Sequence, residues 1–200
     1  YYLIDYRGYA GYEPGDNVIH IFSMGSLTTE AIKASEFLLT KGIYANVIVV
    51  TSPDLLLGIQ AHEQDYQYLK TDLQILSDLY IKRTGDISGS DLVTISGKRV
   101  PIVSVHDGEP GLLDNIGSVV GVKQIACAVR KHSKCGRPTE VYHFHNIDTE
   151  AIVEACGRAL AETAMEQTMV RESSLSDVAE QTQNIQHWAE LWPTKNNQQH

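Results

Sequence analysis

The chain has 200 residues, of which 42% are hydrophobic and 20% charged, as is ordinary for one soluble domain with an appended tail. Its net charge is −9, and it shows no clustered basic face, so we expect no nucleic-acid partner. The basic segment 130–134 is interpreted as a solvated loop. No apolar run approaches the roughly 20 residues of a membrane helix, so we expect no membrane partner.

The three cysteines have no disulfide spacing, which favours a reducing compartment, and we expect the protein to be cytoplasmic. The chain starts at Tyr1 without a methionine or a signal peptide, so we expect a piece of a longer protein. Its tyrosine-rich opening turns at Pro14-Gly15-Asp16, and we interpret residues 1–17 as an interdomain connector.

Residues 18–52 have the pattern of a βαβ unit, with short β-branched runs at 18–22 and 45–50 predicting buried parallel strands. Gly25 permits a sharp turn, Ser26 is the expected helix cap, and Gly42 is the expected left-handed residue that ends the helix. The apolar positions predict that the helix buries Ala31, Ala34, Phe37, Leu38 and Leu39.

The next segment predicts a helix start at Thr51-Ser52-Pro53-Asp54, with Leu55-Leu56-Leu57 against the sheet edge. Leucine and tyrosine spacing predicts a helix at about 64–83. The Gly-, Ser- and Asp-rich stretch 84–98 indicates a loop, with a possible short strand at 92–95.

A third buried strand is predicted at 101–106, followed by a turn and a short helix to about Ile116. A fourth strand is predicted at 118–122, whereas 125–129 fits either a strand or a helical turn. A short helix is expected at 138–145.

Asp148 is the expected cap of a long helix over 149–168, which completes an α/β domain over 18–168. The buried face of that helix is predicted to comprise Ile152, Ala155, Cys156, Ala159, Leu160 and Thr163. Residues 169–200 are interpreted as a polar tail that docks, if at all, through Trp188, Leu191 and Trp192.

Four segments of the chain carry a family resemblance over about residues 15–165. They are VIHIFSMGSLTTEA, KGIYANVIVVTSPDLLL, RVPIVSVHDGEPGLLDNIG and GVKQIACAVRKHSKCGRPTEVYHFHNIDTEAIVEACGRAL. Together they resemble the C-terminal domain of transketolase-like, thiamine-diphosphate-dependent enzymes. Within that group the chain looks closer to the homodimeric decarboxylating component of pyruvate dehydrogenase than to transketolase itself. It lacks the phenylalanine-glycine pair that the family places after its fourth strand.

The resemblance implies a three-layer α/β/α fold around a mostly parallel five-stranded sheet with one antiparallel strand. It implies an accessory and dimerisation role, with thiamine diphosphate and Mg²⁺ held by the preceding domains of the same chain and no cofactor or catalytic residue in this segment. In such enzymes a Gly-Asp-Gly motif, followed later by Asn, binds the diphosphate through Mg²⁺. Here His106-Asp107-Gly108 and Gly15-Asp16-Asn17 lack that context, and we interpret both as turns.

The carboxyl ends of the strands are where open α/β sheets bind ligands, and two pairs of residues there are site candidates. Gly25 and Ser26 form a turn at a helix start whose backbone amides are candidates for binding an anion, although such turns also arise for geometric reasons alone. His106 and Asp107, with Glu109 nearby, are candidates for acid/base chemistry. The alternative, which we favour, is a packing histidine followed by a helix-capping aspartate.

Five cysteine and histidine side chains suggest a zinc site at first sight, but their spacing, Cys-x4-His-x2-Cys-x7-His-x-His, fits no standard ligand pattern. We therefore predict no metal site there, and an inert Cys156 on the buried helix face. The five residues are Cys127, His132, Cys135, His143 and His145.

Two functional hypotheses stay open from the sequence. The first is the catalytically silent accessory domain of an enzyme that cleaves a carbon–carbon bond beside a carbonyl, by 2-oxo-acid decarboxylation or ketol transfer. The second is a free-standing binding or regulatory module that holds a small anion or a partner protein in an α/β crevice. An independent acid/base enzyme that uses His106 and Asp107 is a third, weaker possibility.

Overall fold

The computed structural model describes residues 1–75, 79–82, 92–95 and 99–176. The chain divides into two compact units, Tyr1–Ala164 and Met165–His200. The first unit contains the sheet and the helices that pack on it. In the second unit the described residues are the last turns of a helix, and the predicted tail anchors Trp188, Leu191 and Trp192 lie outside the described residues.

The main sheet has five strands in the order β1-β3-β2-β6-β7. Strand β1 pairs antiparallel with β3, and the remaining neighbours are parallel. The prediction of a mostly parallel five-stranded sheet with one antiparallel strand is therefore confirmed. The strands are β1 (Tyr2–Ile4), β2 (Val18–Ser23), β3 (Tyr44–Val49), β6 (Ile102–Val105) and β7 (Gln124–Cys127).

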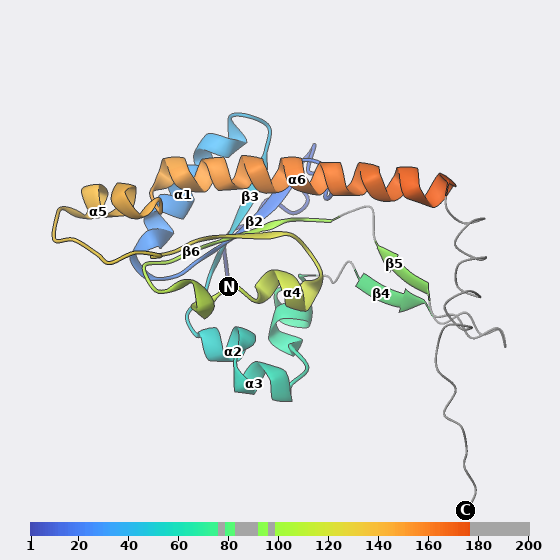
Figure 1. The fold of residues 1–200 in the computed structure, drawn as a ribbon, viewed down its shortest axis with the longest axis horizontal. Helices are drawn as coiled ribbons and strands as arrows, with labels where there is room; N and C mark the ends of the chain where they lie inside the picture. Colours follow the sequence, from blue (N-terminus) through green and yellow to red (C-terminus); the bar gives the residue numbers. More distant parts are fainter. Residues whose placement is uncertain (76–78, 83–91, 96–98, 177–200) are drawn as a thin grey trace, which may run out of the picture. The chain divides into compact units, whose positions relative to one another are not determined.

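Helices cover both faces of this sheet, which confirms the three-layer α/β/α architecture. Helices α1 and α6 lie on one side and α2 and α4 on the other (Figure 1). The helices are α1 (Thr28–Leu39), α2 (Pro53–Leu57), α3 (Ile59–Glu63), α4 (Ile116–Val120), α5 (Pro138–His145) and α6 (Thr149–Ser176).

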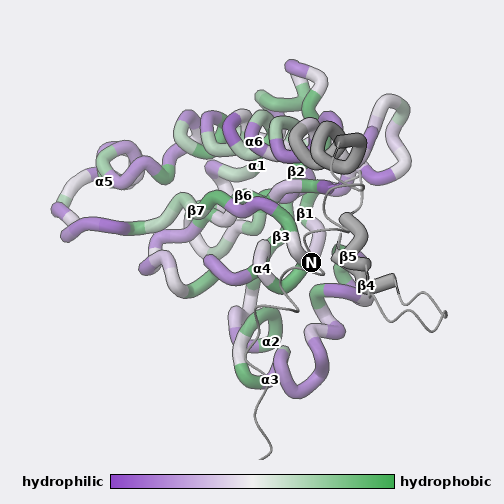
Figure 2. The backbone as a smooth tube through the Cα atoms, turned by 45° about the vertical axis from the view of Figure 1, so that its right-hand side comes forward, coloured by the Kyte–Doolittle hydropathy of each residue, from purple (hydrophilic) through white to green (hydrophobic). Residues whose placement is uncertain are grey.

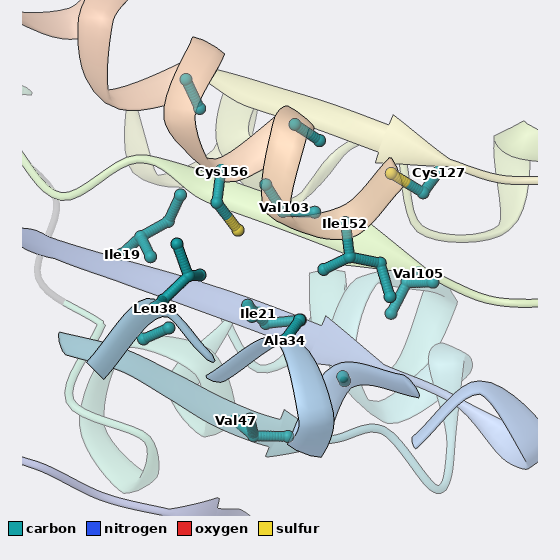
Figure 3. Close-up of a cluster of buried hydrophobic side chains, with 14 of the residues drawn as sticks. Ile19, Ile21, Ala34, Leu38, Val47, Val103, Val105, Cys127, Ile152 and Cys156 are labelled. Carbon is teal, nitrogen blue, oxygen red and sulfur yellow. The ribbon is translucent and has the colours of Figure 1, made fainter. Parts of the chain in front are cut away.

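Successive side chains of a strand point to opposite faces, so β2, which is buried at all six positions, supplies both cores. Ile19 and Ile21 pack with α1 and α6 in the first core (Figure 3). Phe22 packs with α2 and α4 in the second. The hydrophobic stretches follow the strands of the main sheet, whereas the connection from β7 to α5 is largely hydrophilic (Figure 2).

The segment 1–17, expected to be a connector, supplies the antiparallel edge strand of the sheet. The Tyr6 backbone N–H donates to Asn46 Oδ1 at 2.7 Å, and the Tyr6 ring makes edge contacts with Tyr9 and Tyr44. These contacts hold the segment against β3. A role in joining this unit to another domain stays a prediction.

The helix predicted at 64–83 is wrong. Asp65, Tyr66 and Gln74 have positive φ values, in the left-handed region. A right-handed helix requires negative φ at every residue, so it cannot continue through these positions. Only a short π-helical turn forms at Tyr68–Asp72. Residues Leu79–Lys82 instead form strand β4, which pairs antiparallel with β5 (Leu92–Ile95) in a separate two-stranded sheet. The possible strand at 92–95 is thus confirmed, and the rest of the predicted loop, residues 84–91 and 96–98, lies outside the described residues.

The fourth strand predicted at 118–122 is also wrong. Residues 116–120 form α4, and the helix ends at Gly121, whose φ of +74° is the left-handed conformation. The strand follows at Gln124–Cys127, so for 125–129 the strand alternative was correct. The β-branched run suits a strand, but α4 packs its Val120 into the second core, where tertiary contacts outweigh propensity.

Two details of α1 differ from expectation. Ser26 does not cap the helix: it lies in a 3₁₀ turn at Gly25–Leu27, and its hydroxyl bonds elsewhere. Phe37 and Leu39 are exposed at 48% and 41%, and Ser35 lies on the buried face in their place. The left-handed Gly42 is confirmed, with φ of +76°.

The helices at the end of the first unit largely match prediction. Helix α5 spans the expected residues, and Asp148 caps α6 by accepting a hydrogen bond from the Ala151 N–H at 3.1 Å. Helix α6 is longer than expected, ending at Ser176. The residues predicted for its buried face are all buried except Leu160, which is half-buried. Within the described residues no helix is long and apolar enough to cross a membrane.

Candidate functional site

Three of the four sequence-predicted candidates meet at the carboxyl ends of β2 and β6. The Ser26 hydroxyl donates to Asp107 Oδ2 at 3.1 Å and accepts from the Tyr142 hydroxyl at 2.9 Å. Gly25 has a φ of +65°, and a Cβ atom there would lie 3.7 Å from Asp107 Oδ1. The parallel pairing of β2 and β6 brings the two outgoing turns together, and α5 adds Tyr142 from 116 residues away.

The electrostatics of this cluster oppose the anion that Gly25 and Ser26 were considered to bind. The Asp107 carboxylate already accepts from Ser26 and lies beside the glycine turn, so an anion there would face a negative charge. Anion binding at this turn stays a prediction without a supporting contact. Asp107 does not cap the following turn. That turn, at Pro110–Leu112, has Glu109 as its cap residue, and the Asp107 carboxylate accepts from Ser26 instead.

By the alternation of side chains along β6, His106 falls on the same side of the sheet as Ile102, a residue of the second core. Its side chain is fully buried, and Nδ1 accepts a hydrogen bond from the Gly108 backbone N–H at 3.2 Å. In the neutral ring the proton is therefore on Nε2, which has no partner among the described residues. Burial lowers the pKa of His106, which favours that neutral form. His106 lines none of the cavities described below, as expected for a packing histidine.

The five cysteine and histidine side chains do not converge on one point. His143 Nδ1 lies 2.8 Å from Asp148 Oδ2, and His145 Nε2 lies 3.1 Å from the Ser133 hydroxyl. Among the described residues no group of three or more Cys, His, Asp or Glu side chains is placed to hold a metal.

The thiols differ in exposure. Cys135 is exposed, whereas Cys127 and Cys156 are buried. Burial raises the pKa of Cys127 to about 11, and it also raises the pKa of Cys156. Both buried thiols face the first core (Figure 3), so they act as small apolar groups there.

Two cavities lie elsewhere, along the outer edge of β7. A cavity of about 390 Å³ is bounded by β7, the end of α5 and the start of α6, and it includes the buried His145. A second, of about 510 Å³, continues along the start of β7 beside Arg158 and Glu162. Together we call these cavities the β7 groove. Sequence reasoning missed it, because it predicted a strand at 118–122 and left 125–129 open between a strand and a helical turn.

Two further polar groups were missed because their partners are distant in sequence. The Gln124 side chain joins β7 to α4 and β6, and the buried His20 lies 3.3 Å from the Asn46 amide. Burial lowers the pKa of His20 to about 4. A glutamine and a histidine inside strands carry no motif, so the sequence held no signal for either.

The chain matches no protein-family profile and no curated protein in sequence. Its fold is similar to parts of solved transketolases. A transketolase variant from Pichia stipitis in complex with fructose 6-phosphate is 17% identical with a TM-score of 0.51, over 80% of this chain and 18% of that one. Transketolase from Leishmania mexicana is 12% identical with a TM-score of 0.52, over 82% of this chain and 18% of that one. The chain therefore spans less than a fifth of these transketolases and has a transketolase-like α/β/α fold.

Proposed function

We propose that this chain is an accessory domain of a thiamine-diphosphate-dependent enzyme, as the resemblance of its sequence motifs implies. The enzyme would be a transketolase or the decarboxylating component of a 2-oxo-acid dehydrogenase, and the chain would be catalytically silent alone. The fold similarity is the observation that carries the proposal: four fifths of this chain align with under a fifth of a transketolase.

The described residues do not fit a thiamine diphosphate–Mg²⁺ site. At the carboxyl ends of the strands the Asp107 carboxylate already accepts from Ser26 through Oδ2, and among the described residues no group of three metal ligands is found. The Gly15-Asp16-Asn17 turn is also engaged: the Asn17 side chain accepts from the Glu13 N–H and donates to two backbone carbonyls. In the proposed enzyme the cofactor and Mg²⁺ are accordingly held by the preceding domains.

The contribution of this chain would be structural. Its rigid, doubly covered sheet offers a stable surface for docking onto those domains, and we expect it to support a homodimer. Exposed apolar side chains on its helices, such as Phe37 and Ile59, are candidates for the docking contacts.

The test compares the 200-residue chain with a protein that also contains the polypeptide encoded beside it. With thiamine diphosphate, Mg²⁺ and pyruvate or a ketose phosphate, the chain alone should show no turnover. The longer protein should react, and removing residues 18–168 from it should abolish the reaction. Turnover by the chain alone would overturn the proposal. Binding of a small anion by the chain, without any thiamine-dependent reaction in the longer protein, would favour the binding-module alternative.

A further inference from the structure

We propose that the β7 groove is a self-association surface at which two copies of this chain join their sheets edge to edge, with antiparallel pairing of β7 and flanking contacts between the α6 helices. This inference rests on the proposed function in one respect: the homodimer proposed there is the reason for taking a second copy of this chain as the partner. The surface and the residues are argued from the structure. The inference does not depend on the thiamine chemistry.

The backbone of β7 leaves its outer side open. Toward β6, the Lys123 and Cys127 carbonyls accept from the Ile102 and His106 N–H groups at 2.9 and 3.2 Å. Because alternate residues of a parallel strand bond to opposite sides, Gln124, Ala126 and Ala128 direct their N–H and C=O groups outward. The sheet ends at β7 within the described part of the chain. An open edge of this kind is a ready template for another strand.

Among the described residues, one long side-chain hydrogen bond occupies the outer edge of β7. Arg130 Nη2 donates to the Ala126 carbonyl at 3.4 Å, a long hydrogen bond from an exposed side chain. No proline and no inward-pointing charge interrupts Gln124–Cys127. A second strand would replace this single contact by a ladder of backbone hydrogen bonds. It would also free the Arg130 side chain for the rim of the interface.

The charges beside the edge are self-complementary. Glu154 and Arg158 are exposed, lie one helical turn apart on α6 and both line the groove. Helix α6 runs opposite to β7 along the groove: the cavity near Cys127 includes Asp148 and Glu150, and the one near Lys123 includes Glu162.

One twofold axis that passes near Ala126 and near the middle of residues 154–158 would therefore pair β7 with the partner's β7 and α6 with the partner's α6. It would place Ala126 opposite the partner's Ala126, in a pair that exchanges two hydrogen bonds. It would also place Glu154 opposite the partner's Arg158, and the reverse, giving two ion pairs from one patch, as an isologous interface requires. The same axis brings Glu162 toward the partner's Glu150. Glu162 already pairs with Lys123 at 2.5 Å and, more loosely, with Arg158 at 3.8 Å within α6, and these two cations offset that repulsion.

The experiment measures self-association of the 200-residue chain by sedimentation velocity, with E154R, R158E and the double variant E154R/R158E. The wild-type chain should dimerise. Each single variant should weaken the dimer by about tenfold or more, because it replaces two attractions by two repulsions. The double variant should restore the dimer, and an equimolar mixture of the two single variants should form a heterodimer, in which all charges are again complementary. Circular dichroism checks that these exposed substitutions leave the fold intact.

A measurement without substitutions tests the backbone part. Amide exchange by NMR should show Ala126 becoming protected as protein concentration rises, whereas Ile125 and Cys127, which face β6, should be protected throughout; Ala128 lies beyond the strand and is already buried. A monomeric chain, a dimer that ignores both charge reversals, or exchange at Ala126 that does not depend on concentration would each overturn the interface. None of these results bears on thiamine-dependent turnover of the longer protein, so the two proposals fail separately.

Discussion

Gly117 in α4 offers a sharp test of how this helix is fitted against β7. A Cβ atom at this position would lie 2.7 Å from Gln124 Cβ and 2.8 Å from the Val122 carbonyl oxygen. Both contacts are closer than real Cβ atoms approach, and neither involves the flexible end of a side chain. Substitution Gly117→Ala must therefore shift α4 away from β7 or displace Gln124.

Displacing Gln124 disturbs three hydrogen bonds. Its Oε1 accepts from the Gly117 N–H at 2.7 Å, and its Nε2 donates to Ser104 Oγ at 2.9 Å and to the Leu113 carbonyl at 2.7 Å. Overpacking costs about 1–3 kcal/mol, and weakened hydrogen bonds add roughly 1 kcal/mol each. Alanine regains about 1 kcal/mol over glycine within a helix. We expect Gly117→Ala to lower the free energy of unfolding by about 3–5 kcal/mol.

Urea unfolding followed by circular dichroism at one protein concentration measures this effect, and the chain supplies a matched control. Gly157 is also inside a helix and is exposed, and a Cβ atom there would meet no atom of the described residues within 4 Å. Gly157→Ala should therefore stabilise the protein by about 0.5–1 kcal/mol. The two substitutions are chemically identical and should act in opposite directions. A Gly117→Ala variant as stable as the wild type would refute the tight α4–β7 contact.

Three further predictions follow from buried or clustered groups. Burial lowers the pKa of His20 to about 4 in the folded state, whereas in the unfolded chain it is near 6.5, so between these two pH values the unfolded chain binds one more proton. The free energy of unfolding should therefore fall by about 3 kcal/mol as pH drops from 6.5 to 4. Urea unfolding at both pH values should show a smaller fall in His20→Gln than in the wild type, and an equal fall would contradict the assignment. Alkylation followed by mass spectrometry should label Cys135 rapidly and leave Cys127 and Cys156 unlabelled until the protein unfolds; fast labelling of a second thiol would disprove their burial. Tyr142→Phe removes a hydrogen bond to a largely exposed cluster and should cost less than about 1 kcal/mol in thermal or urea unfolding; a larger loss would show that the cluster stabilises the fold.

The sequence was informative where a local pattern agreed with the tertiary structure. The run at 18–22, the left-handed Gly42 and the Asp148 cap were all predicted, because each depends on neighbours within a few residues. The closing helix was located for the same reason. The architecture followed from the strand–helix–strand pattern and the family resemblance together.

The failures occurred where distant contacts decided the local structure. The run at 118–122 has β-branched residues, yet its helix is held by Gln124 and by packing in the second core. At 64–83 the leucine spacing fits a helix, but positive φ values at Asp65 and Tyr66 interrupt it.

The candidate site was predicted only in part. The strand-end rule placed Gly25, Ser26 and Asp107 in one region, and the structure brings them together. It could not identify Tyr142, whose contact with Ser26 spans 116 residues, nor the hydrogen bond that His106 Nδ1 accepts from the Gly108 N–H. The β7 groove depends on the position of the last strand, which the sequence pattern left open, since 125–129 fitted either a strand or a helical turn.

The central claim is that this chain supports a thiamine-dependent reaction without carrying it out. The most direct measurement is steady-state turnover with thiamine diphosphate and Mg²⁺, made in parallel on the 200-residue chain and on a longer protein that includes the polypeptide encoded beside it. The account predicts turnover only in the longer protein, and its loss when residues 18–168 are removed. Turnover by the chain alone, or full activity after that removal, would contradict it.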